Sequence, residues 1–216
     1  MTEKDEALNL HSSKPGKISV EPSVEINTKK DLELVYTPGV AEPCRKINEQ
    51  KENAYTYTSK GNLVAVVSDG SAVLGLGDIG AEASMPVMEG KANLMKKFGG
   101  VDGFPICINA ESAEDIINHV EREAPTFGAI NLEDIKAPRC FEAERKLKEK
   151  LDITVFHDDQ HGRAIVVGAA LRNALDLAGK NLEDSRIVIS GGGAGGMAVA
   201  NFLIDEGAQK ILALDS

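Results

Sequence analysis

Four carboxylates follow two apolar runs of the sequence in a pattern that could hold a metal ion. Glu133 and Asp134 come directly after one run, and Asp158 and Asp159 come after another. If both runs are strands of one open parallel sheet, their carboxyl ends meet at the edge where such sheets bind ligands. Carboxylates brought together repel one another unless protons or a cation neutralise them, and oxygen donors suit Mg²⁺ or Mn²⁺. The pattern therefore predicts a hard divalent metal site.

The same acids also fit a simpler interpretation as helix caps or solvated turn residues, which suits either pair taken alone. Adjacent strand residues point to opposite faces, so Glu133 and Asp134 can share one ion only if the strand has already turned. His157 and His161 flank the second pair and could indicate zinc. Since no cysteine lies nearby and oxygen donors are in excess, we favour magnesium or manganese.

Two further residues could move protons. Lys91 lies in an apolar stretch of a predicted helix, and burial lowers the pKa of a lysine until its amine is a usable base. Taken alone, these residues favour an ordinary lysine, with its stem on apolar surface and its ammonium in water. We expect Tyr36 to be a half-buried aromatic before the turn at Pro38-Gly39. Its phenol could donate a proton beside a cation such as Lys91.

A glycine-rich segment has the spacing of a dinucleotide-binding turn. Gly191, Gly193 and Gly196 form GxGxxG directly after an apolar run, and Ala194 lies where a helix should begin. The first glycine permits a tight turn, the second lets the backbone approach a pyrophosphate, and the third allows close packing of helix on strand. The helix N-terminus supplies free N–H groups for the anion. We therefore predict a site for NAD or NADP, against the alternative of a glycine-rich turn that binds nothing.

The strand after this helix ends at Asp215, where an acidic side chain can accept hydrogen bonds from the adenosine ribose. An acid there favours NAD by repelling a 2′-phosphate, but an arginine beyond Ser216 would restore NADP. A full Rossmann sheet has about six strands. We therefore expect only the start of a Rossmann domain within these residues.

These groups need strands and helices to position them, and the sequence predicts an alternation of both. The predicted strands are Leu63–Val67, Phe104–Ile108, Phe127–Leu132, Ile153–Phe156, Arg186–Ser190 and Lys210–Leu214. The predicted helices are Ala81–Phe98, Ala113–Glu123, Pro138–Lys150, Gln160–Ala178 and Ala194–Asp205. The alternation is typical of an α/β fold with parallel sheets. We expect a substrate and metal domain over residues 1–178, which includes a connecting helix, and an incomplete Rossmann domain over 179–216.

The N-terminal part of the chain is expected to be a surface arm. Residues 1–30 are polar, and Pro15-Gly16 and Pro22 interrupt any helix begun in Thr2–Leu10. Charged residues within Met1–Glu6 stand where a secretory signal would be apolar, so we expect a cytoplasmic protein. The arm could contact a second subunit.

Composition excludes several classes of protein. Hydrophobic residues make up 42% of the chain and aromatic residues 4%, which suits an aliphatic α/β core rather than a disordered chain. The net charge of -10 disfavours nucleic acid, and no apolar run approaches the ~20 residues needed to cross a bilayer. The three cysteines, Cys44, Cys107 and Cys140, are widely spaced. We expect reduced, mostly buried thiols rather than disulfides or a zinc site.

Taken together, six segments in order resemble the malic enzyme family, particularly its shorter bacterial members, from about Gly16 to Ser216. The segments are Val35–Ala41, Val67–Ser71, Gly75–Gly80, Met85–Asn93, Asn131–Pro138 and Phe156–Gly162. The resemblance implies oxidative decarboxylation of L-malate to pyruvate and CO2 with NAD or NADP and Mg²⁺ or Mn²⁺, in a homodimer.

The resemblance also implies roles for individual residues. Lys91 matches the family's general base and Tyr36 its general acid. The family's metal ligands fall on Glu133, Asp134 and Asp159, and Asp158 is a neighbour that could orient the site. These roles suit the chemistry expected of each residue type.

The chain departs from the family's pattern in two places. Longer members carry an arginine shortly after the Asp-Gly that corresponds to Asp69-Gly70, whereas this chain has Ser71-Ala72. Family asparagines that contact substrate and nicotinamide would fall beyond Ser216, so we expect these residues alone to be a fragment of the catalytic unit.

Three rival functions remain open. A malolactic-type enzyme would decarboxylate malate at the same site without net redox change. An amino-acid dehydrogenase also joins a substrate domain to a Rossmann unit, but it would not need the carboxylates. A noncatalytic dimerisation or metal-binding module would bind Mn²⁺ without reducing a nicotinamide.

Overall fold

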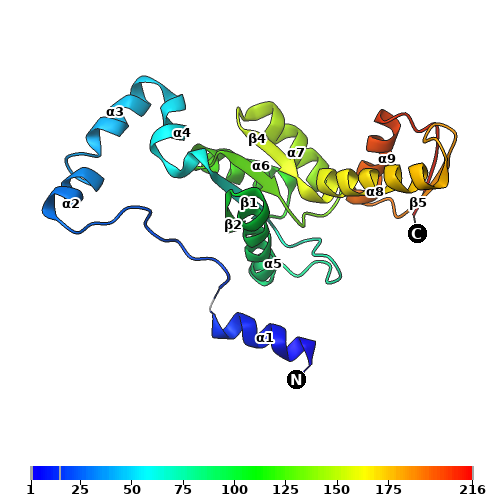
Figure 1. Cartoon of the computed structure of the whole chain (residues 1–216), viewed down its shortest axis with the longest axis horizontal. Helices are drawn as coiled ribbons and strands as arrows, with labels where there is room; N and C mark the ends of the chain where they lie inside the picture. Colours follow the sequence, from blue (N-terminus) through cyan, green and yellow to red (C-terminus); the bar gives the residue numbers. More distant parts are fainter. Residues whose placement is uncertain (1, 15, 216) are drawn as a thin grey trace.

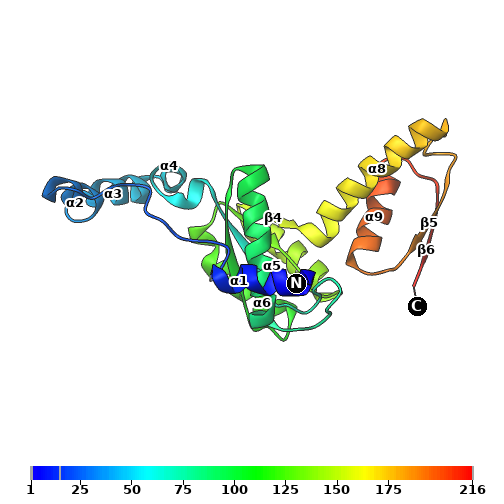
Figure 2. The same cartoon turned by 60° about the horizontal axis from the view of Figure 1, so that its bottom comes forward.

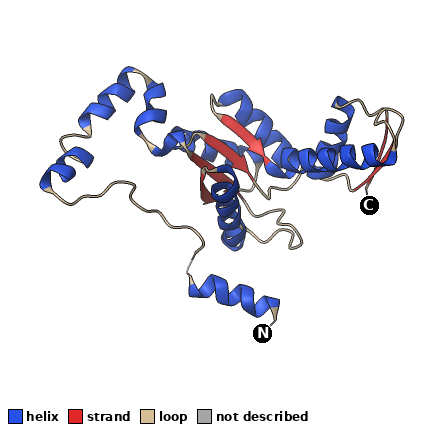
Figure 3. Ribbon diagram, in the orientation of Figure 1, coloured by secondary structure: helices blue, strands red, loops and turns tan. Residues whose placement is uncertain are grey.

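The computed structural model describes residues 2–14 and 16–215 of the 216-residue chain. At its centre lies a four-stranded parallel sheet with the strand order β2-β1-β3-β4 (Figures 1 and 3). The strands are β1 (Leu63–Ser68), β2 (Asp102–Cys107), β3 (Ala129–Leu132) and β4 (Thr154–His157). The α/β class with a parallel sheet is thereby confirmed.

Helices cover both faces of this sheet, which explains why its strands read as continuous apolar runs. These helices are α5 (Ala81–Leu94), α6 (Ala113–Glu123) and α7 (Arg139–Lys150). Ile117 of α6 and Leu147 of α7 belong to the main buried cluster, together with Val67 and Ile130 of the sheet. Helix α5 contacts β1 and β2, and its buried Met88 lies outside that cluster. Helix α5 therefore covers the opposite face.

The C-terminal residues form a second, smaller strand–helix–strand unit. Helix α8 (Arg163–Ala178) runs from the first sheet towards it (Figure 2). The unit consists of β5 (Arg186–Ser190), α9 (Ala194–Asp205) and β6 (Lys210–Leu214), and its two strands pair in parallel apart from the first sheet. A separate hydrophobic cluster joins α8 and α9. Gly179 ends α8 with φ 64°. The domain boundary after residue 178 stays a prediction.

The N-terminal arm extends beyond the predicted residues 1–30, to about residue 58, and its described part carries four helices without a buried residue: α1 (Glu3–Ser13), α2 (Lys29–Val35), α3 (Ala41–Glu49) and α4 (Ala54–Tyr57). Helices α2 and α3 lie away from the sheet in both views of the chain (Figures 1 and 2). Short 3₁₀ turns lie at Lys51–Asn53 and Ser59–Gly61, next to α4, and a further one lies at Ala124–Thr126, between α6 and β3. The arm therefore has no core of its own.

Two predicted helices differ from the observed ones in the same way. The helix predicted to end at Phe98 changes after Leu94 into a π-helical turn over Met95–Gly99. The helix predicted to begin at Gln160 begins at Arg163, because a π-helical turn, η5 (Asp158–Gly162), precedes it. Apolar periodicity does not distinguish these turns from α-helix, and π turns are frequent at functional sites.

Two expectations about surfaces can also be compared with the structure. Among the cysteines, only Cys140 is fully buried, Cys107 is intermediate and Cys44 is exposed on α3, so the expectation of mostly buried thiols is wrong for Cys44. Within the described residues, no helix combines the length and the apolar composition needed to cross a membrane.

Helix α5 approaches the sheet closely through one glycine. A Cβ added at Gly103 of β2 would lie 2.8 Å from the backbone Cα of Ala92. At Gly99, the nearest atom to an added Cβ would be a side-chain carbon of Val101 at 3.8 Å.

We predict that Gly103→Ala lowers the free energy of unfolding by about 1–3 kcal/mol, because the added methyl must push α5 off the sheet. Urea denaturation followed by circular dichroism measures the change. Gly99→Ala is the matched control and should leave the free energy of unfolding unchanged. Equal losses in the two variants would contradict this account of the packing.

Candidate active site

Three of the predicted metal ligands lie together at the carboxyl edge of the sheet. Glu133 and Asp134 follow β3, and Asp159 lies in η5 directly after β4. One oxygen of each carboxylate lies within 4.8 Å of the others, and the three residues are only 3–6% exposed. The parallel pairing of β3 with β4 brings the two strand ends to the same edge.

The chain turns at Asp134, which allows adjacent acids to share one site. Asp134 has φ 54° and is the one non-glycine residue with a positive φ in the described part of the chain. Its N–H donates to Asp159 Oδ2 at 2.8 Å, and its carbonyl accepts from the N–H of Ala72 at 2.9 Å. These two hydrogen bonds hold a conformation that costs an aspartate about 1–3 kcal/mol. Because the strand has already turned here, the side chains of Glu133 and Asp134 need not point to opposite faces of the sheet.

The environment shifts the pKa values of the three acids in different directions. Burial raises the pKa of Glu133 to about 7, and Lys91 and Asn131 only partly offset it. Burial and the charge of Asp159 raise the pKa of Asp134 to about 6. Burial also raises the pKa of Asp159, but its contact with His157, the hydrogen bond from the Asp134 N–H and the charge of Arg163 leave this pKa lowered overall.

The cluster fits a hard divalent cation. Asp134 Oδ2 is buried and has no hydrogen-bond partner among the described residues. A buried polar atom without a partner is costly and rare in folded proteins. The donors that converge here are all carboxylate oxygens, the ligand type that Mg²⁺ and Mn²⁺ prefer. Glu133, Asp134 and Asp159 would hold such an ion.

Lys91 reaches this cluster from α5. Its Nζ lies 2.6 Å from Asp158 Oδ2 and 3.2 Å from Glu133 Oε1, and its side chain is 21% exposed. Burial lowers the pKa of Lys91, but the hydrogen bond to Asp158 and the charges of both carboxylates outweigh burial and raise the pKa overall. The expected lowering is therefore wrong, because burial at this position comes with two anionic partners. The alternative of an unpaired, solvated lysine is also wrong.

Tyr36 does not lie in this cluster. It is the C-cap of α2, on the N-terminal arm, and it is 68% exposed. In Figures 1 and 2, α2 and α5 occupy separate parts of the molecule. The expectation of a half-buried tyrosine is wrong, because the arm has no layer against which the ring can pack. Within one chain, the structure does not bring Tyr36 to Lys91.

The glycine-rich turn has the geometry expected of each glycine. Gly191 has φ 109°, and a Cβ at Gly196 would lie 1.9 Å from the Gly191 carbonyl oxygen. Gly193 is the N-cap of α9, which begins at Ala194, and a Cβ there would meet no atom within 4 Å. Open space beside a helix N-terminus fits a pyrophosphate.

This turn also lies beside the carboxylate cluster. A Cβ at Gly195 would lie 3.3 Å from the Asp159 carbonyl oxygen and 3.1 Å from Arg163 Cδ. On the other side, a Cβ at Gly192 would lie 3.1 Å from Asp215 Oδ2. The glycine turn thus lies between Asp215 on one side and the backbone of Asp159 on the other.

The sequence reasoning missed several residues that support the cluster. Arg163 pairs with Asp159 Oδ1, and their spacing of four residues in the sequence could have indicated the pair. Asn131 donates to Glu133 Oε2 at 2.9 Å, as expected for residues two apart on one strand face. Glu144 of α7 contacts Gln160, and no sequence signal connects the two.

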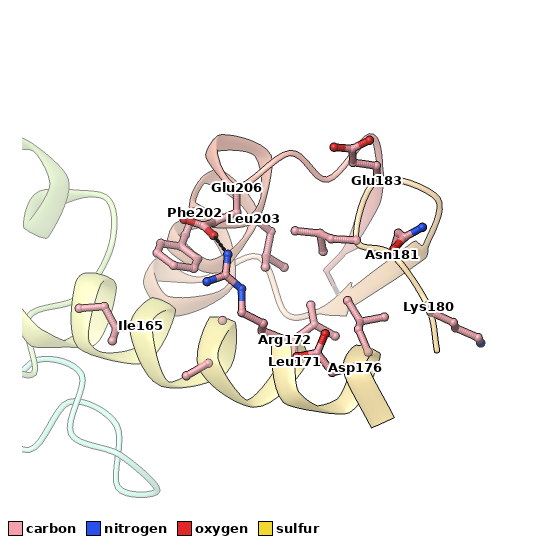
Figure 4. Close-up of a pocket in the computed structure, with 14 residues that line it drawn as sticks. Ile165, Leu171, Arg172, Asp176, Lys180, Asn181, Glu183, Phe202, Leu203 and Glu206 are labelled. Carbon is pink, nitrogen blue, oxygen red and sulfur yellow. Dashed lines mark hydrogen bonds and ion pairs between the residues drawn. The ribbon is translucent and has the colours of Figure 1, made fainter. Parts of the chain in front are cut away.

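A hollow of about 690 Å³ between α8, α9 and the 180–183 loop is shown in Figure 4. Arg172 and Glu206 form an ion pair of 2.7 Å across it, and its wall includes Leu171, Phe202 and Leu203. None of the predicted catalytic, metal or nucleotide residues lines it. The chemistry suggested by the sequence belongs to the carboxylate cluster instead.

The chain is similar to known proteins along its whole length. Residues 15–148 match the family model "Malic enzyme, N-terminal domain". The NAD-dependent malic enzyme of Geobacillus stearothermophilus is 56% identical over 200 residues, which cover 93% of this chain and 42% of that protein. The bifunctional malic/malolactic enzyme of Bacillus subtilis is 52% identical over 216 residues, which cover 100% of this chain and 53% of that protein.

Solved structures agree as well. The crystal structure of the malic enzyme from Pyrococcus horikoshii matches with a TM-score of 0.95 and 49% identity, and the match covers 100% of this chain and 51% of that one. The chain spans about half or less of the length of the curated relatives that it matches. Because the family model covers more than half of its residues, the chain belongs to the malic enzyme family.

Proposed function

We propose that this protein takes part in the oxidative decarboxylation of L-malate to pyruvate and CO2, with NAD or NADP as oxidant and Mg²⁺ or Mn²⁺ as metal. The observation that carries the proposal is the position of Lys91 Nζ, 3.2 Å from the predicted ligand Glu133. A substrate hydroxyl oriented by the metal would meet this amine. The glycine turn beside Asp159 supports a hydride acceptor at the same place.

Each group has one task in this reaction. A divalent cation held by Glu133, Asp134 and Asp159 supplies Lewis-acid stabilisation of the negative charge that develops on the substrate oxygen. The nicotinamide supplies the acceptor for the hydride that leaves C2. Gly193 and the N-terminus of α9 bind the pyrophosphate, and Asp215 accepts hydrogen bonds from the ribose.

Lys91 accepts the proton of the substrate hydroxyl, and Asp158 positions the amine of Lys91. The raised pKa of Lys91 means that the amine holds a proton in this arrangement, so it must lose that proton before it can act as a base. The Lys91 side chain is 21% exposed, so this proton can pass to solvent, while Asp158 Oδ2 lies 2.6 Å from Nζ and holds the amine by an ion pair. Lys91 then accepts the hydroxyl proton as hydride leaves, and Asp158 keeps the amine in line with the metal site.

We predict that Lys91→Ala lowers malate-dependent reduction of NAD or NADP by about 10²–10⁴-fold, the usual contribution of a general base. Absorbance at 340 nm with Mn²⁺ present measures the rate with each nucleotide. Lys97→Ala, at an exposed position further along the same segment, is the control and should leave the rate unchanged. A Lys91→Ala rate equal to that of the control would contradict the proposal.

The Bacillus subtilis relative is a bifunctional enzyme that is named for a malolactic reaction as well. The products distinguish the two reactions, because oxidative decarboxylation releases pyruvate with one reduced nucleotide per CO2, whereas malolactic decarboxylation releases lactate with no net reduction. The position of Lys91 suits both, and the glycine turn favours neither. We propose pyruvate as the product, because most of the similar relatives are named NAD- or NADP-dependent malic enzymes.

Tyr36 requires a second copy of the chain if it is to act as the acid. The arm that carries it presents exposed apolar side chains, including Leu34, Val35 and Val40. Apolar groups gathered on an unsupported arm indicate a surface that another chain covers. In a two-fold symmetric dimer each arm can reach its partner's sheet. We therefore place Tyr36 of one subunit beside Lys91 of the other, in a homodimer.

This arrangement predicts complementation between two defective variants. Tyr36→Phe and Lys91→Ala should each be inactive alone, but their mixed dimer has one site with both native residues. Coexpression should therefore restore roughly a quarter of the native activity, if subunits pair at random. Native mass spectrometry verifies that mixed dimers form. Mixed dimers without activity would contradict the shared site.

A further inference from the structure

A chain of buried polar side chains leads from α7 to the predicted ligand Asp159. Gln160 Nε2 lies 2.8 Å from Glu144 Oε2 and 2.7 Å from His157 Nδ1. His157 Nε2 lies 3.4 Å from Asp159 Oδ2. All four residues are less than 9% exposed, and His157 is 0% exposed. Water therefore has little access to these contacts.

The contacts fix the direction of each hydrogen bond. Glu144 Oε1 lies 2.8 Å from Lys148 Nζ and 2.6 Å from His161 Nε2, and its other oxygen, Oε2, faces the Gln160 amide. A carboxylate only accepts, so the Gln160 atom that faces Oε2 must be the amide nitrogen. The second N–H of that amide points to His157 Nδ1, which must therefore accept.

The proton of a neutral His157 ring then lies on Nε2. This nitrogen has no hydrogen-bond partner within the described residues, and Asp159 Oδ2 is the acidic oxygen it faces. A protonated nitrogen has no lone pair for a metal. A ring with the opposite tautomer would instead aim a free lone pair at the same carboxylate edge.

We infer that Glu144 and Gln160 are positioning residues that hold His157 in the Nε2–H tautomer. In this state His157 donates towards Asp159 and cannot become a ligand, so the metal site keeps oxygen donors alone and prefers Mn²⁺ or Mg²⁺ over Zn²⁺. Zinc binds imidazole nitrogen readily, whereas magnesium and manganese favour oxygen. The metal preference rests on the proposed function, but the tautomer does not depend on it.

Exchanging the side chains of Glu144 and Gln160 tests this inference, because the exchange changes the shape of the site little and leaves the net charge of the protein unchanged. In the double variant Glu144→Gln/Gln160→Glu, the new amide can donate to the new carboxylate and still accept from Lys148 and His161. The carboxylate at position 160 accepts from His157, so the ring proton should move to Nδ1. Glu149→Gln, at an exposed position on α7, is the matched control.

The first readout is the tautomer of His157, measured from the ring ¹⁵N shifts of the metal-free protein. The native chain and the control should show Nε2–H, and the double variant Nδ1–H. The second readout is metal affinity by titration. The double variant should bind Mn²⁺ about 10–100-fold more weakly, the usual effect of losing an outer-shell partner, and its preference for Zn²⁺ over Mn²⁺ should rise.

The outcomes separate this inference from the proposed function. An Nδ1–H tautomer in the native chain would overturn the inference by itself, even if the double variant does not fold. A reversed tautomer with an unchanged Zn²⁺ to Mn²⁺ preference would overturn the role in metal selection. If the native chain shows Nε2–H but binds no Mn²⁺, the proposed metal site fails while the assigned tautomer stands, and the claim of metal selection falls with the site.

Discussion

The cost of burying several carboxylates together, away from water, is the constraint on which the rest of the site depends. Burial raises the pKa of Glu133 to about 7 and that of Asp134 to about 6. The folded chain therefore binds more protons than the unfolded chain between about pH 4 and 7, so these groups favour folding at low pH and lose that contribution as pH rises through their folded pKa values. A bound cation would offset this loss, since it neutralises the same oxygens without protons.

Three positive or donor groups contact the cluster in the part of the chain that the structure describes. Lys91 contacts Glu133, Arg163 contacts Asp159, and Asn131 donates to Glu133. Each comes from a different element, namely α5, the start of α8 and β3. One of the partners that lower the cost of buried negative charge is the amine of Lys91, which these carboxylates hold at the cluster. Charge compensation and the placement of the amine thus depend on one set of contacts.

The sequence predicted the parts of this arrangement that depend on local pattern. Strand ends followed by acids, together with parallel pairing, were enough to bring Glu133 and Asp159 together. The left-handed turn at Asp134 could not be predicted, because it depends on long-range hydrogen bonds from Ala72 and to Asp159. The raised pKa of Lys91 was missed for the same reason. The exposure of Tyr36 was missed because a single chain contains no surface to cover its arm.

Manganese binding measured at two pH values tests the cluster most directly. Calorimetric titration at pH 7.5 should show one site whose binding releases protons to the buffer, because the raised pKa values of Glu133 and Asp134 leave part of their protons to be displaced. At pH 5.5 both acids hold their protons, so the affinity should be roughly 100-fold lower. Asp159→Asn should abolish binding at both pH values, whereas Asp205→Asn, at an exposed position, should not. Affinity that is independent of pH, or unchanged in Asp159→Asn, would contradict a metal site at these carboxylates.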